Sequence, residues 1–321
     1  MDWTRLPVPG RVTALQRGLC AGVTTEGTVF VSHLRLPHAN PTTYDDVLVD
    51  SFGVLGVAPG PEPWLTGRGA DGRLQLWTAR DDDTTVESSS LDGIDAMWAA
   101  PATDAGTELL LSCHLSEGSW RLRTYDRQSA IAGGAPKARD LPLAGPPDTS
   151  FVLGCPEKDP LVVAGRLGDS GAATAWAFSG DWRRIHLSRA PSALTSVAYA
   201  WGGRHTWIGG VADGSAAVYE LLPLPFRGPL RSFTLPMPHL ELVHIPDGGG
   251  RPLVLVDDTT GDQPVFVAAT GRGNRLCWHD GAEWKAFPAP DGPLRAACAS
   301  GGAVHLLVGQ TLWSIEDPTA G

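Results

Sequence analysis

Residues 2–9 read DWTRLPVP, and residues 283–290, near the other end of the chain, read EWKAFPAP. Both phrases begin with an acidic residue followed by tryptophan, and both end in Pro-x-Pro. When one residue is inserted, Gly10 after the first phrase aligns with Gly292 after the second. We interpret the two phrases as two copies of one structural element, so the way in which the rest of the chain repeats decides the fold.

The sequence between the two phrases has the pattern of short β-strands. Apolar residues alternate with polar ones or form short runs, and the runs end at Gly, Pro, Asp or Ser, which is typical of strands joined by turns. The 39 Gly and 27 Pro residues are spread along the chain as turn formers. With 42% apolar and 19% charged residues, the chain can bury a core. We therefore predict an all-β fold.

A unit of about 45 residues recurs along the chain, and the unit contains four strands. Residues 52–91 show it best, with FGVLGVAPG, PWLTGRG, ADGRLQLWTAR and TTVESSSL as the strands. Residues 264–288 repeat the pattern, with TGRGNRLCW in place of TGRGADGRLQLW. Four-stranded units of this length, repeated around an axis, are the blades of a β-propeller. We predict a seven-bladed β-propeller, with the approximate blade limits 11–51, 52–92, 93–143, 149–188, 193–237, 239–290 and 293 onward.

The last predicted blade, residues 293–317, contains only three strands. The strand that it lacks should resemble EWKAFP, the outer strand just before it, and the N-terminal phrase DWTRLP has that pattern. We therefore predict that residues 2–8 supply the fourth strand and close the ring, so that no sheet edge is left open. On this prediction, residues 1–321 form a single domain. Residues 239–288 contain one strand too many for one blade, so rings of six or eight blades are the alternatives.

Two parts of the repeat resemble known families. The pattern W-x-x-L-P-x-P-G followed by GTVFVSH, over residues 3–33, resembles tectonin-type repeats. The units GRGADGRLQLW and GRGNRLCWHDGAEW are similar to repeats of the seven-bladed lectins related to Photorhabdus lectin. Both families are sugar-binding propellers, so the resemblance implies a lectin-like function. The paired Gly-His and Trp-Asp signature of WD40 repeats is absent from the sequence.

The composition argues against two classes of partner. A net charge of −10 without a Lys/Arg cluster argues against nucleic acid and against an anionic membrane surface. The N-terminus has no basic and apolar leader, and no apolar run approaches the roughly 18 residues needed to span a bilayer. The five cysteines are far apart and form no CxxC pair. We therefore expect free, buried thiols in a cytoplasmic protein.

The sequence lacks the common motifs for catalysis and metal binding: it has no GxSxG, HExxH, Walker A or EF-hand pattern. Residues 67–72, GRGADG, match GxGxxG, but a predicted strand follows them in place of a helix, so we interpret these glycines as turn formers. We expect the acidic pair Asp257-Asp258 to be solvated. A calcium site that uses Asp257, Asp258 and Asp262 is an alternative, and otherwise we predict no metal and no cofactor.

Tryptophan is unusually frequent, with 12 residues. Trp77 and Trp278 both end the third strand of a unit, and Arg68 and Arg272 lie in matching Gly-Arg-Gly turns a few residues before them. Packing between blades is one role for such a Trp side chain. In the alternative, a Trp ring lines a cleft and stacks on a flat ligand, while a nearby Arg or Asp hydrogen-bonds its hydroxyl groups. The predicted ligand-binding residues are Arg68, Asp71, Trp77, Arg272, Asn274, Trp278 and His279.

These observations favour a binding function over catalysis. The leading hypothesis is a module that binds a glycan or another polar small molecule, and a protein-interaction scaffold is an alternative. The rival hypothesis is an enzyme, such as a lyase, hydrolase or cyclase of specialised metabolism, with its site in the central funnel. A binder should have similar pockets in several blades, whereas an enzyme should gather His, Asp and Arg at one end of the axis.

Overall fold

In the computed structural model, the residues that are described are 2–16, 18–34, 41–44, 53–55, 64–69, 71–79, 86–90, 96–100, 109–126, 139–145, 151–154, 161–178, 181–187, 190–199, 206–213, 215–221, 253–257, 259, 263–270, 272–280 and 283–318. Every structural feature below belongs to these residues.

The described strands form seven antiparallel sheets that follow one another along the chain. Sheet 1 comprises β2 (Gly10–Gln16), β3 (Leu19–Thr24), β4 (Val29–His33) and β5 (Thr42–Tyr44). Sheet 2 comprises β6 (Gly53–Leu55), β7 (Trp64–Arg68), β8 (Leu74–Ala79) and β9 (Val86–Ser90). Sheet 3 comprises β10 (Ala96–Ala100), β11 (Leu109–Ser116), β12 (Ser119–Asp126) and β13 (Leu141–Pro142). Sheet 4 comprises β14 (Phe151–Gly154), β15 (Leu161–Arg166), β16 (Ala173–Phe178) and β17 (Trp182–Ile185). Sheet 5 comprises β18 (Ala193–Tyr199), β19 (Thr206–Ala212) and β20 (Ser215–Leu221). Sheet 6 comprises β21 (Leu253–Leu255), β22 (Phe266–Thr270), β23 (Gly273–His279) and β24 (Trp284–Pro288). Sheet 7 comprises β25 (Leu294–Ser300), β26 (Ala303–Val308), β27 (Thr311–Glu316) and, on its outer edge, β1 (Thr4–Arg5).

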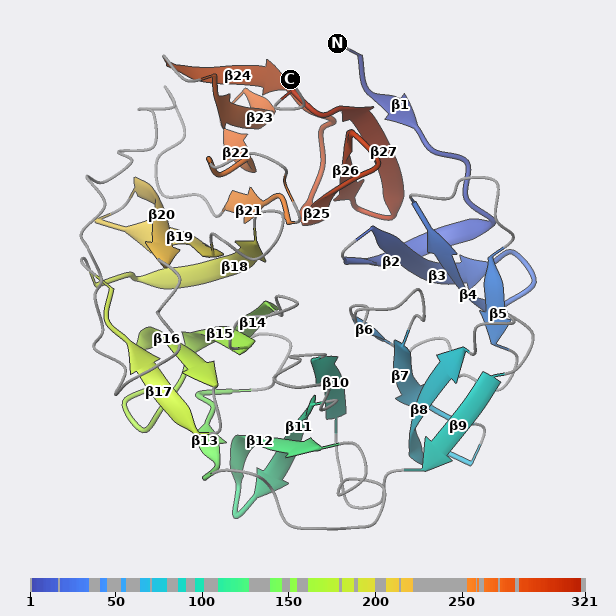
Figure 1. The fold of residues 1–321 in the computed structure, drawn as a ribbon, viewed down its shortest axis with the longest axis vertical. Helices are drawn as coiled ribbons and strands as arrows, with labels where there is room; N and C mark the ends of the chain where they lie inside the picture. Colours follow the sequence, from blue (N-terminus) through green and yellow to red (C-terminus); the bar gives the residue numbers. More distant parts are fainter. Residues whose placement is uncertain are drawn as a thin grey trace.

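The seven sheets stand around a common axis, and the strand nearest the axis is β2, β6, β10, β14, β18, β21 or β25 (Figure 1). Contacts join neighbouring sheets through these inner strands: β2 contacts β6, β6 contacts β10, β14 contacts β18, β18 contacts β21, and β21 contacts β25. A β-bridge between Leu143 and Leu167 joins sheets 3 and 4. Contacts between β25 and β2 make sheets 7 and 1 neighbours as well.

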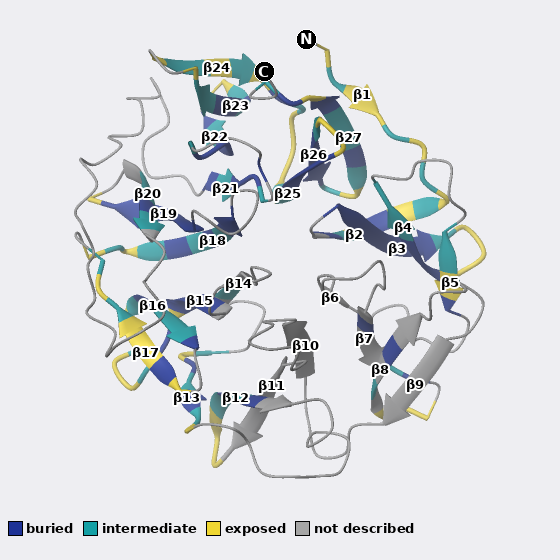
Figure 2. Cartoon of the chain, viewed as in Figure 1, coloured by how far each residue is buried: buried dark blue, intermediate teal, exposed yellow. Residues whose placement is uncertain are grey.

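The sheets bury both of their faces against one another. Leu19 of sheet 1 packs in one cluster with Leu65 and Trp77 of sheet 2. On the opposite face of sheet 1, Val12 packs in another cluster with Leu307 of sheet 7. Exposed residues gather at turns and outer strands (Figure 2). Burial on both faces explains why many strands read as short apolar runs and lack a simple alternation.

β1 lies along the outer edge of sheet 7, where it pairs antiparallel with β27. Just beyond β1, the Leu6 N–H donates a hydrogen bond to the Leu312 carbonyl oxygen at 3.0 Å. Just before β1, the Trp3 indole N–H donates to the Pro288 carbonyl oxygen at 2.8 Å. Because Pro288 ends the outer strand of sheet 6, the Trp3 side chain links the outer edges of sheets 6 and 7.

The phrase of an acidic residue followed by Trp recurs at the start of three outer strands, as Asp2-Trp3, Asp181-Trp182 and Glu283-Trp284. Trp284 packs with Phe266 in the cluster that joins sheet 6 to sheet 5. Trp3 packs in the cluster that joins sheet 7 to sheet 6. In both sheets the Trp therefore lies at the junction with the preceding sheet, which accounts for the repeated phrase.

The strand that the sequence predicts in excess, at residues 240–246, lies outside the described residues. Sheet 6 begins at Leu253 and has four strands. Sheet 5 has three described strands, and its predicted outer strand, at residues 230–236, also lies outside the described part of the chain.

Three inner strands carry a one-residue β-bulge at matching positions. In β2, the register with β3 shifts between Val12 and Ala14, so Thr13 is the extra residue. Thr195 in β18 and Arg295 in β25 are the extra residues of the corresponding shifts. A bulge bends its strand and redirects the side chain of the extra residue. Three sheets therefore redirect a side chain near the start of their innermost strand.

Glycines in the second strands of sheets 1 and 5 face two of these bulges. A Cβ atom at Gly22 would lie 2.1 Å from the Arg11 carbonyl oxygen. A Cβ atom at Gly210 would lie 2.3 Å from the Ala193 carbonyl oxygen. Both contacts involve the backbone, so rotation of a side chain cannot relieve them. The bulged inner strands can approach the second strands this closely only where glycine stands.

Gly210→Ala should lower the free energy of unfolding by about 1–3 kcal/mol, because the added methyl group must displace the Ala193 carbonyl group. Urea unfolding measures this difference. Thr25→Ala, in the exposed turn between β3 and β4, is the control and should stay within about 0.5 kcal/mol of the wild type. Equal stability of the two variants would contradict the close contact.

His305 is a buried polar side chain in the middle of sheet 7. It is 4% exposed, and its Nε2 lies 3.2 Å from the Ser300 carbonyl oxygen. Burial lowers the pKa of the imidazole, and the hydrogen bond to Ser300 opposes this effect in part. Its Nδ1 has no hydrogen-bond partner among the described residues. The folded chain therefore holds His305 neutral more strongly than the unfolded chain does.

The stability of the chain should contain a His305 contribution that is lost as the pH falls. Below the unfolded-state pKa of about 6.5, the unfolded chain takes up a proton at His305 and the folded chain does not, which favours unfolding. His305→Gln should therefore reduce the loss of unfolding free energy between about pH 7 and pH 5, as measured by urea unfolding. His186→Gln, on an exposed residue, is the control. An unchanged pH dependence in His305→Gln would show that His305 is not responsible.

Candidate functional site

The predicted site residues Arg68 and Asp71 both make hydrogen bonds within the hairpin between β7 and β8. Arg68 Nη1 donates to the Gly72 carbonyl oxygen at 2.9 Å. Asp71 Oδ1 accepts from the Arg73 N–H at 3.0 Å, and its Oδ2 lies 3.8 Å from Arg73 Nε. These contacts stabilise the shape of the turn. Ligand binding by the two residues stays a prediction.

The predicted site residues Trp77 and Trp278 pack on opposite faces of their sheets. Trp77 is 4% exposed and packs with Leu19, toward the preceding sheet. Trp278 is half-buried and packs against the cluster that contains Leu306, toward the following sheet. The ring of Trp77 is thus enclosed between sheets 1 and 2, as the packing alternative expects.

A difference of one residue in register separates the two tryptophans. Trp77 lies opposite Leu65, and both side chains face the preceding sheet. In sheet 6, the corresponding pair is Cys277 with Phe266, whose side chains face the preceding sheet. Trp278 follows Cys277, and because successive side chains of a strand point to opposite faces, it faces the other neighbour. The sequence-based alignment of these two tryptophans is therefore wrong.

The two Gly-Arg-Gly turns are not equivalent either. Arg68 is the last residue of β7, and the backbone N–H of Gly69, the next residue, bonds across the following turn to the Arg73 carbonyl oxygen at 2.9 Å. In sheet 6, Thr270 pairs with Gly273, so Arg272 lies inside a shorter turn. The Arg272 side chain is exposed, and its backbone N–H donates to Thr270 Oγ1 at 3.1 Å. Arg68 is a paired residue of a strand, whereas Arg272 lies in a turn, so the two guanidinium groups do not occupy equivalent positions.

Asn274, another predicted site residue, clamps the chain segment that leads from sheet 6 to sheet 7. Its side-chain Nδ2 donates to the carbonyl oxygens of Pro290 at 2.6 Å and Gly292 at 3.0 Å. The backbone carbonyl oxygen of Asn274 accepts a hydrogen bond from the Ala289 N–H at 2.9 Å. Asn274 is buried, and both donors of its amide group are used. The contacts show a structural role, whereas a role in ligand binding stays a prediction.

Asn274→Ala should lower the free energy of unfolding by about 1–3 kcal/mol, because two backbone carbonyl groups lose their donor. Thermal or urea unfolding measures the change. The control is Arg272→Ala on the neighbouring exposed turn, which should remain within about 0.5 kcal/mol of the wild type. If Asn274→Ala is as stable as Arg272→Ala, the clamp does not hold the connecting segment.

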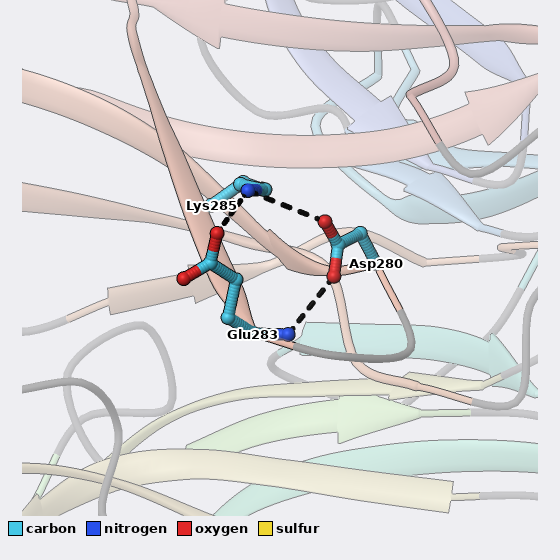
Figure 3. Close-up of polar contacts among 3 residues, drawn as sticks. All are labelled: Asp280, Glu283 and Lys285. Atoms are coloured by element: carbon cyan, nitrogen blue, oxygen red, sulfur yellow. Dashed lines mark hydrogen bonds and ion pairs between the residues drawn. The ribbon is translucent and has the colours of Figure 1, made fainter.

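His279, the last predicted site residue, lies beside a surface turn whose charges are paired. Its ring meets the ring of Trp284 edge-on, with centroids 5.3 Å apart. In the adjacent turn, the Glu283 N–H donates to Asp280 Oδ1 at 2.9 Å, and Lys285 Nζ binds both carboxylates (Figure 3). The hydrogen bonds to Glu283 and then to Asp280 raise the pKa of Lys285. The turn thus satisfies its own charged groups.

Asp257 joins the inner strands of three sheets. Its Oδ1 accepts from the Tyr199 N–H at 2.8 Å, at the end of β18. Its backbone N–H donates to the Ala297 carbonyl oxygen at 3.2 Å, and its carbonyl oxygen accepts from the Ala299 N–H at 2.6 Å, both in β25. One residue therefore holds sheets 5, 6 and 7 together close to the axis.

The alternative calcium site overlaps this junction. Of its three residues, Asp257 uses one carboxylate oxygen for Tyr199, and Asp258 and Asp262 lie outside the described residues. Within the described ranges, no group of three or more His, Cys, Asp or Glu side chains could hold a metal ion. The calcium site stays a prediction.

The described cysteines are structural. Cys20, Cys277 and Cys298 are free and buried. Burial raises the pKa of the Cys20 and Cys277 thiols to about 12. A thiol needs to ionise to act as a nucleophile, so these two are unreactive at neutral pH. The side chains of Cys113 and Cys155 lie outside the described part of the structure.

A group that the sequence did not single out lies at the start of the inner strands. Arg11 is near the start of β2, and Arg295 is the bulged residue of the neighbouring strand β25. Both side chains are exposed, as is Thr13, although all three belong to innermost strands. Neither guanidinium group has an ion pair or hydrogen bond with any residue that the structure describes. We call Arg11, Thr13 and Arg295 the axial group.

The axial group lies at one end of the ring. Leu294, at the start of β25, pairs with Val308, which precedes the turn into β27. Leu6 is bonded to Leu312, just after the same turn. The four residue steps from Leu6 to Gly10 span at most about 14 Å, so β2 must start at the end of the ring where β25 starts. Arg11 and Arg295 therefore emerge from neighbouring strands at the same end.

Arg272 lies at this end as well. β21 and β25 run parallel where Asp257 bridges to Cys298. Leu253, at the start of β21, pairs with Ala268, so the turn that follows β22 lies at the start of β21. The turn with Arg272 is thus at the same end as the start of β25. Arg272 therefore shares this end of the ring with the axial group, as does Asn274, which pairs with Ala269 beside the same turn.

Sequence reasoning missed the axial group because a bulge leaves no clear mark in the hydrophobic pattern. Thr13, Thr195 and Arg295 have different chemical character, and only their position in the register relates them. The available signal was the glycine opposite the bulge, at Gly22 and Gly210.

Comparison with known proteins places the fold. No protein-family model and no curated protein match the chain. Among solved structures, the chain is similar to the RRP9 WD40 repeats, with a TM-score of 0.52 and 13% identity over 98% of this chain and 97% of that chain. It is also similar to the Dos1 propeller, with a TM-score of 0.52 and 8% identity over 93% and 75% of the two chains.

A third similar structure is a larger protein. An acylaminoacyl peptidase matches with a TM-score of 0.53 and 11% identity, over 94% of this chain and 51% of that chain. The chain thus spans about half of the length of the peptidase. At these identities the comparisons show the fold alone, and they confirm the predicted all-β propeller architecture. They give no support to the predicted lectin resemblance.

In the part of the chain that the structure describes, no helix has the length and apolar character that crossing a membrane requires.

Proposed function

We propose that this chain is a binding module, built as a seven-bladed β-propeller that β1 closes, and that it binds an acidic segment of a partner protein through the axial group. The seven sheets and the pairing of β1 with β27 support the architecture. The observation that carries the binding proposal is the exposure of Arg11 and Arg295 on neighbouring innermost strands, at the same end of the ring.

Arginine suits this role because its planar guanidinium group can bind a carboxylate through two parallel N–H···O bonds. Neither Arg11 nor Arg295 is engaged by the residues that the structure describes, so an incoming carboxylate displaces no described ion pair. The Thr13 hydroxyl donates to the Ala21 carbonyl oxygen at 3.5 Å, and its oxygen can accept a hydrogen bond from a backbone N–H of the partner segment. Arg272, exposed at the same end, extends the basic surface away from the axis.

The overall charge of the chain opposes an acidic partner only at long range. The net charge is −10, but physiological salt screens exposed charges beyond about 8 Å. At contact distance, the local pair of guanidinium groups therefore determines the sign of the interaction. We expect slow, salt-dependent association, followed by short-range bonds that hold the complex.

A protein partner is favoured over a glycan for two reasons. The chain is similar in fold to WD40 repeats, a likeness that favours a protein-interaction role. The glycan hypothesis relied on Trp77 and Trp278 as stacking platforms; the Trp77 ring is enclosed between two sheets, and Trp278 faces the opposite side of its sheet. Glycan binding stays a prediction of the sequence, and so does an enzymatic function at the axis.

The double variant Arg11→Gln/Arg295→Gln should weaken binding of acidic peptides by at least about tenfold, because each charge-assisted hydrogen bond contributes about 1.5–3 kcal/mol. An array of peptides that contain glutamate and aspartate identifies a binding peptide. Fluorescence anisotropy then gives its affinity for the wild type and the variant at low and high salt. The salt dependence should be smaller for the variant.

Arg5→Gln is the matched control, since Arg5 is also exposed but lies on β1 at the outer edge of sheet 7. It should keep the wild-type affinity. If the double variant binds as tightly as the control, the axial group is not the binding site. Capture of glycans in place of acidic peptides, with unchanged dependence on Arg11 and Arg295, would contradict the choice of a protein partner.

A further inference from the structure

Two exposed carboxylate groups lie at the end of the ring that carries the axial group. Glu26 is in the turn between β3 and β4, and Asp291 is in the segment that leads from β24 to β25. Both residues are exposed, and neither carboxylate group has an ion pair or hydrogen bond with any residue that the structure describes. Both groups can therefore contact a bound partner.

Glu26 lies on the outer side of Arg11. Gly10 pairs with Thr24, so the turn that follows β3 begins beside the start of β2. The Gly27 N–H donates to the Thr24 carbonyl oxygen at 3.1 Å, which closes the turn around Glu26. Because β2 is the innermost strand of sheet 1 and β3 is the next strand outward (Figure 1), Glu26 is farther from the axis than Arg11.

Asp291 lies near Arg295, on the side of sheet 6. The Asn274 clamp holds the residues before and after Asp291. A Cβ atom at Gly273 would lie 2.3 Å from Asp291 Oδ1, so the carboxylate group rests against the turn between β22 and β23. The four residue steps from Asp291 to Arg295 span at most about 14 Å. Asp291 is therefore fixed between Arg295 and the turn of sheet 6.

The four charged groups form an ordered row across this end of the ring. β2 and β25 are neighbours at the axis, so their two guanidinium groups lie between the two carboxylate groups. The order is Glu26, Arg11, Arg295 and Asp291. Like charges across an interface oppose binding, and opposite charges favour it. An extended segment that follows the row therefore fits best when its centre is acidic and both of its flanks are basic.

We propose that the segment bound by the axial group has a basic residue on each side of its acidic centre, and that Glu26 and Asp291 select this pattern by binding the two flanks. This inference rests on the proposed function and specifies the sequence of the partner. Because an extended chain advances roughly 3.3–3.6 Å per residue, each basic residue should lie about two to four positions from the acidic centre.

The net charge of the chain favours the same pattern. With a net charge of −10, the chain repels a purely acidic segment until the segment comes within the screening length of about 8 Å. Basic flanks cancel the charge of the acidic centre, so a flanked segment approaches without this repulsion. The flanked segment should therefore associate faster than a purely acidic segment of the same length.

Three fluorescent peptides test the pattern on the wild-type chain by anisotropy. The first is K-x-x-E-E-x-x-K, with serine at x. The second, E-x-x-K-K-x-x-E, has the same composition in the opposite order, and the third has glutamate at all four charged positions. The first peptide should bind at least about tenfold more tightly than the second and at least about threefold more tightly than the third, which is the scale of a few exposed ion pairs.

A double variant shows whether the two carboxylate groups cause the preference. Glu26→Gln/Asp291→Asn should remove the advantage of the first peptide over the third. Asp2→Asn/Glu316→Gln is the matched control, because it removes the same charge from two exposed residues at the other end of the ring, where Glu316 pairs with Ala303 at the start of β26. This control should keep the wild-type preference.

The outcomes distinguish this inference from the proposed function. If Arg11→Gln/Arg295→Gln weakens binding but Glu26→Gln/Asp291→Asn leaves the preference unchanged, the proposed function stands and the inference is wrong. A preference that Asp2→Asn/Glu316→Gln also removes would be an effect of net charge and would overturn the inference as well. Binding that does not depend on Arg11 and Arg295, or no binding of any of the three peptides, would overturn both.

Discussion

The packing of one sheet face on the next is the interaction on which the rest of the structure depends. Among the described residues, sheets 1, 5, 6 and 7 bury apolar side chains on both faces against their neighbours, as Leu65 and Trp77 show between sheets 1 and 2. Burial of apolar surface stabilises by roughly 25 cal/mol per Å². A gap in the ring would expose an apolar face on each of the two sheets beside it, and the stabilisation from both faces would be lost. The contact of Val12 with the Leu307 cluster, between the first and last sheets, follows from that requirement.

The inner strands add a second requirement, because their axial edges lack a ladder partner and buried backbone groups need hydrogen bonds. Sheets 5 and 6 meet this need with side chains: Thr195 Oγ1 donates to the Leu253 carbonyl oxygen at 2.8 Å, and the Leu255 N–H donates to Ser196 Oγ at 3.2 Å. Asp257 continues the same row toward sheet 7. Where β25 meets β2, the bulged residue is Arg295 and its side chain is exposed. The bulged residue thus joins two sheets in the case of Thr195, whereas in the case of Arg295 its side chain is exposed.

The sequence allows the propeller, the limits of most units and the likeness of the two acidic-Trp phrases to be predicted, because hydrophobic runs and turn residues are local properties. It does not allow the register of a pair of strands to be predicted, and for that reason the alignment of Trp77 with Trp278 is wrong. Trp77 and Trp278 align in the sequence, yet one residue of register places them on opposite faces. The sequence also gives no sign of the two bonds that the Asn274 side chain donates to the Pro290 and Gly292 carbonyl oxygens, while its role in ligand binding stays a prediction.

On the proposed function, stability and recognition use different residues in this chain. The tryptophans Trp3, Trp77 and Trp284 lie at junctions between sheets, where they support assembly, and Trp77 is 4% exposed. Binding chemistry must come from side chains that packing does not use, and such side chains occur at strand ends and in turns. The bulges supply them without weakening the junctions, since the residues on either side of Arg295, Leu294 and Ala296, still pack against sheets 6 and 1. A degenerate repeat can in this way keep one set of positions for the ring and change the bulged residue from sheet to sheet.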